Sequence, residues 1–166
     1  MKNFLMMIAF SFCWQIDAPS ASADDVKLEK VTFEQLKKAV ESHKGKVVVL
    51  DIWGTFCPPC KAKYPHLVAM HHKLKDKGLV IISLSVDFTD EEKDVVDFLQ
   101  SQKAVFPNYL LDDSEENKVK WDKIWQHNSL PAIHIFGKDG TKVESLIGEK
   151  AGKMLDEIVE KHLVVK

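Results

Sequence analysis

The strongest constraint on the fold is an apolar, β-branched run over residues 47–52 that leads into a close cysteine pair. An apolar run without alternation indicates a strand covered on both faces, as the central strands of parallel sheets are. Such a sheet needs helices on both sides, so we predict an α/β protein. The run contains one charged residue, Asp51, and Cys57 and Cys60, separated by two prolines, follow it after a short turn.

The rest of the chain alternates between predicted helices and strands. A capping box at Thr32 and apolar residues at helical spacing predict a helix over 32–42. A helix over 59–77 and a buried strand over 79–86 complete a right-handed βαβ unit with the first strand. The remaining predicted elements are a helix after a capping box at Thr89, a strand over 108–111, a helix with Trp121, Ile124 and Trp125 on one face, strands over 132–136 and 143–147, and a closing helix striped by Met154, Leu155, Ile158 and Val159. This order predicts a mixed sheet packed between helices.

The first 23 residues differ in character from the rest of the chain. Lys2 is followed by an apolar run over 4–14 and by Ala21-Ser22-Ala23, a small-x-small site that a signal peptidase recognises. The run is shorter than the roughly 20 apolar residues that span a bilayer. We therefore expect residues 1–23 to be a cleavable export signal and residues 24–166 to be one domain located in the periplasm.

The charge pattern argues against two classes of partner. The formal net charge is −2, and acidic and basic residues are interspersed. This pattern provides no basic stripe for nucleic acid and no polybasic tract for an anionic membrane surface. We expect neither to be a partner of this chain.

The two cysteines that remain after signal cleavage, which discards Cys13, are suited to redox chemistry. A disulfide across two intervening residues closes too small a loop to restrict the unfolded chain much. A sulfur at a helix N-terminus faces unpaired N–H groups, which lower a thiol pKa from about 8.5 to roughly 3.5–7.5. We therefore predict that Cys57 attacks a substrate disulfide and that Cys60, one turn further into the helix, resolves the mixed disulfide. Asp51 is placed to accept the proton of Cys60, directly or through a water molecule.

Other interpretations of these residues stay open at this point. The cysteine pair could be an inert structural pair or half of a zinc site, although His66, His71 and His72 do not converge on one helix face. Two thiolates are also soft ligands that suit Cu(I), which would make the chain a copper carrier. Asp51 could instead be an end-of-strand residue turned to solvent.

Three segments together resemble exported thioredoxin-fold thiol-disulfide oxidoreductases of the TlpA-like group. They are residues 47–65, the Leu130-Pro131 step and the Asp139-Gly140 hairpin. The resemblance covers nearly all of the chain after the signal. It implies a thioredoxin fold, with a central mixed sheet flanked by helices, in which residues 89–112 form the helix and strand that such proteins insert.

The resemblance also implies roles for individual residues. Cys57 would be the attacking cysteine and Cys60 the resolving one, while Trp53 would pack under the loop. Pro131 matches the cis-proline of the family, whose loop lies beside the cysteines and pairs with an extended substrate segment. The substrate-binding surface implied in this way consists of Trp53, Phe56, Pro58, Leu130 and Pro131.

The sequence departs from the TlpA-like pattern at three positions. Phe56 stands where most relatives have a tryptophan, and Lys63 stands where many have a glutamate. Asp51 matches the buried aspartate of ordinary thioredoxins, at a site where many exported relatives are neutral. We hypothesise that Asp51 supplies the proton transfer that a glutamate at position 63 would supply. Lys61 and Lys63 affect the redox potential. Nearby cations stabilise a thiolate, so these two lysines make the couple more oxidising.

These features predict a thiol-disulfide oxidoreductase that exchanges its Cys57–Cys60 dithiol with disulfides of protein substrates, as a reductase. No bound cofactor or metal is needed for this chemistry. The resemblance implies a membrane electron donor of the disulfide-reductase type, and we expect a monomer. An oxidase or isomerase on the same fold, and a non-catalytic copper-binding protein, are the alternatives.

Overall fold

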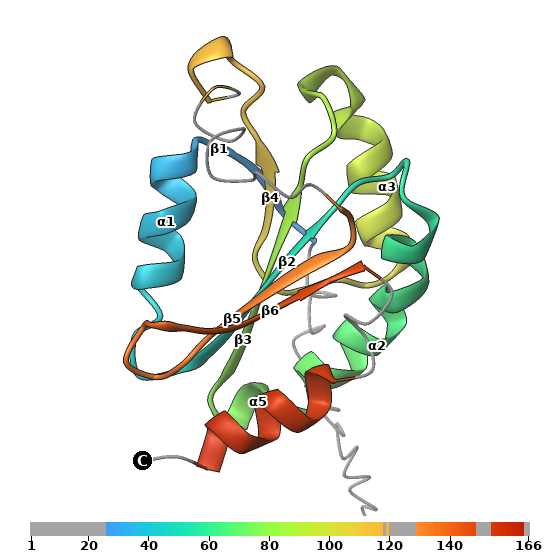
Figure 1. Ribbon diagram of the computed structural model, residues 1–166. Coiled ribbons are helices and arrows are strands. Elements are labelled where there is room, and N and C mark those ends of the chain that lie inside the picture. The colour runs from blue at the N-terminus through green and yellow to red at the C-terminus, as the bar shows by residue number, and fades with distance from the viewer. Residues whose placement is uncertain (1–25, 118, 120–128, 149–153, 165–166) are drawn as a thin grey trace, which may run out of the picture.

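The computed structural model describes residues 26–117, 119, 129–148 and 154–164 of the 166-residue chain. Its centre is a six-stranded sheet in the order β1-β4-β3-β2-β5-β6 (Figure 1). The strands are β1 Leu28–Val31, β2 Val47–Trp53, β3 Leu79–Ser85, β4 Asn108–Leu111, β5 Ala132–Phe136 and β6 Lys142–Ile147. The first four strands in spatial order pair in parallel, and β5 and β6 are joined to the sheet by antiparallel pairing. The predicted mixed sheet is confirmed.

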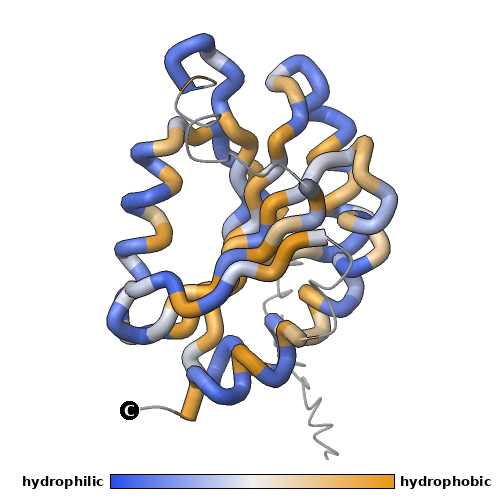
Figure 2. Tube along the Cα trace, in the orientation of Figure 1, coloured by the Kyte–Doolittle hydropathy of each residue, from blue (hydrophilic) through white to orange (hydrophobic). Residues whose placement is uncertain are grey.

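Helices cover both faces of this sheet (Figure 1). The helices are α1 Phe33–Glu41, α2 Pro58–Leu74, α3 Glu92–Ser101 and α5 Leu155–Val164, with short 3-10 turns η1 Lys75–Lys77 and η2 Thr89–Glu91. One core packs α2, α3 and α5 against the sheet, and a second core packs α1 against the opposite face. Figure 2 shows the strands at the centre as the most apolar part of the trace.

Strand β2 shows why both faces are covered. All seven of its residues are buried. Val47, Val49 and Trp53 belong to the core under α2, whereas Val48, Leu50 and Ile52 belong to the core under α1. Because side chains alternate along a strand, Asp51 lies on the same face as Val49 and Trp53, which is the face covered by α2.

The two predicted capping boxes have different outcomes. At Thr32 the box is formed, because the Gln35 amide donates to the Thr32 hydroxyl and the Thr32 amide donates to the Gln35 side chain, at 3.3 and 2.8 Å. At Thr89 the prediction is wrong. The Thr89 amide and hydroxyl both donate to Asp113, at 3.1 and 3.0 Å, because that carboxylate lies against η2 from the segment after β4. Helix α3 therefore begins only at Glu92.

The insertion predicted from the resemblance consists of η2, α3 and β4. Strand β4 lies between β1 and β3, so it separates two strands that would otherwise be neighbours. Strand β1 was not predicted. It has four residues, of which only Val31 is buried, so its sequence carries little strand signal.

The remaining predicted boundaries agree closely with the structure. Strands β4 and β5 have the predicted limits. Helix α2 ends at Leu74 and continues as η1, and Gly78 then reverses the chain with a left-handed φ of 95°, which favours glycine. The predicted signal with Cys13, and the predicted helix with Trp121, Ile124 and Trp125, lie outside the described residues. Within the described segments, we find no helix long and apolar enough to cross a membrane.

Candidate active site

The cysteine pair lies where the carboxyl end of β2 turns into α2. Cys57 is the N-cap of α2, with an extended backbone at φ −108° and ψ 94°. Pro58 and Pro59 occupy the first helical positions, where an N–H group has no acceptor within the helix. The strand, turn and helix predicted around the pair are therefore present.

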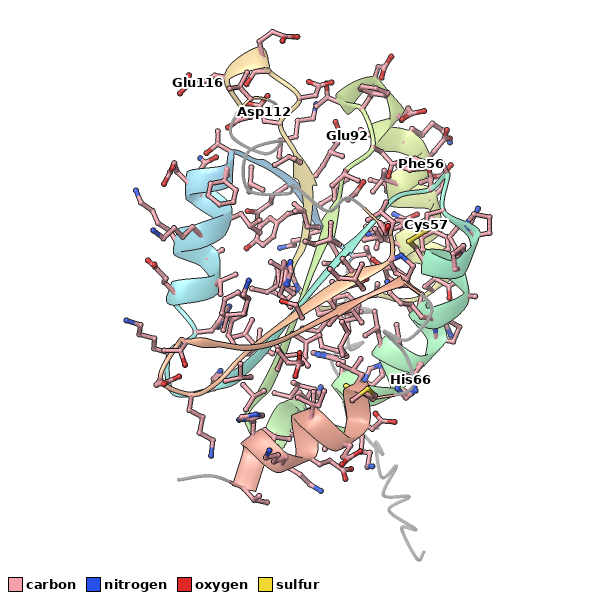
Figure 3. The ribbon with its side chains drawn as sticks, viewed as in Figure 1. Phe56, Cys57, His66, Glu92, Asp112 and Glu116 are labelled. Atoms are coloured by element: carbon pink, nitrogen blue, oxygen red, sulfur yellow. A yellow bond between two sulfur atoms is a disulfide. The ribbon has the colours of Figure 1, made fainter. Side chains whose placement is uncertain are left out.

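Cys57 and Cys60 form a disulfide, drawn as a yellow bond beside the Cys57 label in Figure 3. Their sulfur atoms are 2.03 Å apart, and the Cys60 amide donates a hydrogen bond to the Cys57 sulfur at 3.3 Å. Cys57 is 6% exposed and Cys60 is fully buried. Cys57 is therefore the more accessible of the two residues, and the attacking role of Cys57 and the resolving role of Cys60 stay predictions.

The turn before Cys57 is fastened to the end of β3 by Asp87. The Thr55 amide donates to both carboxylate oxygens at 2.9 and 3.1 Å, and the Thr55 hydroxyl donates to one of them at 2.5 Å. The Ser85 hydroxyl donates to the other oxygen at 2.5 Å. Because Asp87 is buried, these donors replace its lost hydration. Sequence reasoning missed Asp87, although a carboxylate directly after a buried parallel strand lies at the same sheet edge as the end of β2.

Trp53 lies under the loop, as predicted, and takes part in a buried network. Its indole nitrogen donates to the Ser83 hydroxyl at 2.8 Å, and the Tyr64 hydroxyl lies 2.5 Å from the same oxygen. The ring centroids of Tyr64 and Phe98 are each 4.9 Å from that of Trp53. Trp53 is fully buried, so its assignment to the substrate-binding surface is wrong. Its role is to support the loop from below.

The Leu130–Pro131 peptide bond is cis, as the resemblance implied. Ala132 pairs with Ile52, which places Pro131 level with Trp53 at the end of β2 that leads to the cysteines. The Pro131 carbonyl accepts a hydrogen bond from the Gly148 amide at 2.8 Å. This hydrogen bond ties the Pro131 loop to the residue that follows β6.

Asp51 is fully buried beside Lys63, whose side chain is 10% exposed. The Lys63 nitrogen lies 2.5 Å from Oδ1 of Asp51, and among the described residues no other donor reaches either Asp51 oxygen. Burial raises the pKa of Asp51, and the Lys63 cation offsets part of that rise. The alternative of a solvent-facing Asp51 is therefore wrong. A carboxyl group whose pKa is raised is suited to take up and release a proton.

The position of Asp51 relative to Cys60 follows from α2. Cys60 and Lys63 are three residues apart on this helix, so they share one face. That face packs on the side of β2 where Asp51 lies, because Cys60 belongs to the same core as Val49 and Trp53. The structure thus brings Asp51, Lys63 and Cys60 into one buried region.

Tyr64 adds a neutral partner to this region. Burial raises its pKa well above the ordinary value of 10, and the negative charge of Asp51 raises it further. Tyr64 therefore keeps its proton and serves as a hydrogen-bonding group rather than as an acid.

The histidines considered as zinc ligands lie apart from the cysteine pair. His66 contacts Asp156 at 3.1 Å, and the rings of His71 and His72 pack edge to face with centroids 5.5 Å apart. Within residues 26–117, 119, 129–148 and 154–164, no three His, Cys, Asp or Glu side chains are grouped to hold a metal ion.

Residues 16–144 match the AhpC/TSA family. The chain belongs to this family. Two curated relatives are named thiol-disulfide oxidoreductase ResA. The relative from Bacillus cereus is 30% identical over 145 residues, which are 87% of this chain and 76% of that protein. The relative from Oceanobacillus iheyensis is 32% identical over 129 residues, which are 76% of this chain and 62% of that protein.

Solved structures of other proteins show the same fold. A thiol-disulfide isomerase from Corynebacterium glutamicum has a TM-score of 0.65 at 19% identity, covering 76% of this chain and 86% of its own. A thiol:disulfide interchange protein of the thioredoxin family from Chlorobium tepidum has a TM-score of 0.61 at 19% identity, covering 74% and 83%. The thioredoxin-like fold and the predicted family resemblance are confirmed. This AhpC/TSA member is a thiol-disulfide oxidoreductase.

The other predicted site residues surround the disulfide at the surface. Phe56 and Pro58, on either side of Cys57, are exposed, and Leu130 is half-buried. These side chains are accessible to a substrate. The Thr55–Asp87 contact and the Lys63–Asp51 contact are the parts of the site that sequence reasoning did not identify.

Proposed function

We propose that the chain is an exported reductase of disulfides in other proteins. The observation that carries the proposed direction is the pairing of Lys63 with Asp51. A lone cation near the reactive sulfur would stabilise its thiolate and make the couple oxidising. Here the Lys63 charge is offset by a carboxylate 2.5 Å away. A pair without net charge favours the thiolate less, which supports a reducing couple.

The proposed reaction has two exchange steps. The Cys57 thiolate attacks one sulfur of a substrate disulfide, forms a mixed disulfide and releases the other substrate cysteine as a thiolate, which takes a proton from water. Cys60 then loses its proton and attacks the Cys57 sulfur. The second substrate cysteine leaves as a thiolate, so the substrate gains two electrons and the enzyme disulfide forms.

Asp51 is the proposed proton acceptor in the second step. Cys60 is fully buried, so water has little access to its proton. The carboxylate of Asp51 lies under the same helix face and has no other hydrogen-bond donor within the described residues. The proton therefore moves from the Cys60 sulfur to Asp51, directly or through a bound water molecule.

The proposed setting is the periplasm, reached through a signal peptide over residues 1–23. Regeneration of the dithiol there requires an electron donor outside the cytosol, and we propose a membrane protein of the disulfide-reductase type. We propose that the chain acts as a monomer. Mass spectrometry of the exported protein tests the proposed signal peptide, because cleavage after Ala23 would leave Asp24 at the N-terminus.

The decisive experiment is the redox potential of the Cys57–Cys60 couple, measured by equilibration with thiol-disulfide buffers. We expect a value near that of thioredoxin, about −270 mV, and far from the value of about −120 mV of a strong oxidant. A potential near the latter value would reverse the proposed direction. Accelerated reduction of insulin by dithiothreitol would support exchange activity, whereas stoichiometric copper retained through dialysis, without such acceleration, would support the copper carrier instead.

Substrate proteins can be trapped with Cys60→Ser. Without the resolving thiol, the mixed disulfide on Cys57 should persist and be recovered under non-reducing conditions. The matched control, Cys57→Ser, should trap nothing, because Cys60 is buried.

A further inference from the structure

Two exposed phenylalanines lie on either side of one hydrogen-bonded contact beside the disulfide. Phe56 is 64% exposed and Phe88 is 58% exposed. Phe56 directly follows Thr55, and Phe88 directly follows Asp87, the two residues joined by hydrogen bonds of 2.5–3.1 Å. Consecutive Cα atoms are about 3.8 Å apart, so both rings leave the surface within one residue of this contact. Cys57 comes next after Phe56, as the labels in Figure 3 show, and the Thr55–Asp87 contact holds Phe88 at the same edge of the sheet.

The backbone under both rings is firmly held although the rings are exposed. Asp87 is 2% exposed and fixes Thr55, while the Phe88 amide donates to the Glu91 carboxylate at 3.1 Å. The Phe56 ring lies across Gly54, where a side-chain carbon would come within 2.5 Å of it. These contacts position two apolar rings toward solvent without covering them. Exposed apolar groups gathered at one place mark interaction surfaces.

Phe88 has no role in the exchange chemistry or in the core. It is on the turn between β3 and η2, outside both apolar cores. Burial of an exposed phenyl ring against an apolar group is favourable, because it removes apolar surface from water. The ring is therefore available to be buried by a substrate that binds at Cys57.

The surroundings of Phe88 are acidic. Residues 87–97 contain six carboxylates and one lysine, Lys93, which is paired with Asp97, and Glu92 is paired with Lys30 of β1. Residues 112–116 add four carboxylates and no base. Hydrogen bonds from Thr89 hold the second segment against the first.

Figure 3 shows this acidic region at the same end of the molecule as Phe56 and Cys57, with labels on Glu92, Asp112 and Glu116. A segment that docks beside Cys57 therefore meets apolar rings first and negative charge next to them. Positive charge on the partner would be attracted to this face and would speed its association.

We propose that Phe88 is a specificity-determining residue which, together with Phe56, binds an apolar side chain next to the attacked cysteine of a protein substrate whose neighbouring residues are basic. This proposal rests on the thiol-disulfide exchange activity and holds for either direction of exchange. The occupant is an extended peptide segment, because the same edge of the sheet carries the reactive sulfur and the Leu130–Pro131 loop.

The test compares disulfide peptides with a small disulfide. Reduced enzyme is mixed with a peptide disulfide that carries Phe and Lys beside the cysteine, with a matched peptide that carries Ser and Glu, and with hydroxyethyl disulfide, which has no side chains. We expect the unmodified chain to react about tenfold faster with the Phe/Lys peptide than with the Ser/Glu peptide. Phe88→Ala should remove most of this preference and leave the rate with hydroxyethyl disulfide unchanged.

Further variants test the apolar and the charged contributions separately, each with a control away from the disulfide. Val164→Ala, at an exposed apolar residue of α5, should leave every rate unchanged, as should Asp76→Lys in η1. Asp90→Lys should weaken the preference for the basic peptide, and added salt should do the same.

Equal rates for the two peptides, or a preference that Phe88→Ala leaves undiminished, would overturn the proposal. A Phe88→Ala variant that loses only self-association, seen by sedimentation, would also overturn it and assign the rings to a second copy of the chain. Loss of activity toward hydroxyethyl disulfide in the unmodified chain would instead contradict the exchange function itself.

Discussion

Lys63 places its nitrogen 2.5 Å from a carboxylate oxygen of Asp51, although the two residues come from α2 and β2. In the TlpA-like pattern many proteins carry a glutamate at the position of Lys63, which beside Asp51 would give two buried carboxylates. Lysine gives a pair of opposite charges instead. The proposed proton acceptor, Asp51, and the cation that balances its charge, Lys63, are therefore both residues that differ from that pattern.

Asp51→Asn should slow the resolving step. The amide cannot accept the proton of Cys60, and general base catalysis typically contributes about 10²-fold or more. The first step, attack by Cys57, should keep its rate. Single-turnover kinetics that follow the mixed disulfide separate these steps. An unchanged resolving rate across the pH range would contradict the proposed role of Asp51.

Lys63→Met should raise the pKa of Asp51 further. Burial already raises this pKa, and the Lys63 cation is the group that lowers it again. The carboxylate form would then appear only at higher pH, so the pH profile of the resolving step should shift upward. The control is Lys77→Met, at an exposed lysine of η1 beyond the other end of α2, which should leave the profile in place.

Thr55→Val should loosen the turn before Cys57. The variant keeps the shape and the amide of Thr55 but removes the hydroxyl that donates to Asp87 at 2.5 Å. We expect a loss of about 1–2 kcal/mol in the free energy of unfolding, since hydrogen bonds to charged groups are the stronger kind. Urea denaturation measures this loss. Thr55→Ser, which keeps the hydroxyl, should recover most of the stability.

His134 should make the protein less stable in mild acid. Burial lowers its pKa to about 4, with a smaller effect from Lys142, and its Nδ1 lies 2.8 Å from the Ser145 hydroxyl. The unfolded chain therefore binds a proton between pH 6.5 and about 4 that the folded chain does not, so stability falls as the pH is lowered through this range.

His134→Leu isolates this contribution. The difference between the unmodified chain and the variant should change by on the order of 1–2 kcal/mol between pH 7 and pH 4, after allowance for solvent screening. Asp51 acts in the opposite sense, because its raised pKa favours the folded state at low pH, and this effect cancels in the comparison. If the difference in unfolding free energy between the unmodified chain and the variant does not change with pH, the pKa of His134 is the same in the folded and unfolded states.

Local sequence patterns were sufficient for the elements that carry the disulfide. An apolar run such as β2 has to be buried on both faces, and the two prolines after Cys57 fit the first turn of a helix but not its interior. The strand limits of β4 and β5 likewise follow from apolar residues bounded by turn signals. The mixed sheet and the cysteine pair at the start of a helix were therefore accessible from local patterns. The thioredoxin-like arrangement followed from the family resemblance, and the burial of Asp51 stayed open until the structure showed it.

The tertiary structure alone decided which side chains meet. Thr89 binds Asp113 instead of its own helix, Thr55 binds Asp87, and Lys63 reaches Asp51. Each pair joins segments whose distance depends on how helices and strands pack, and a periodic pattern in one segment contains no information on that distance. Trp53 lies four residues before Cys57 in the sequence, so its place near the cysteines could be predicted. Its complete burial beneath them depends on how other segments pack and could be known only from the structure.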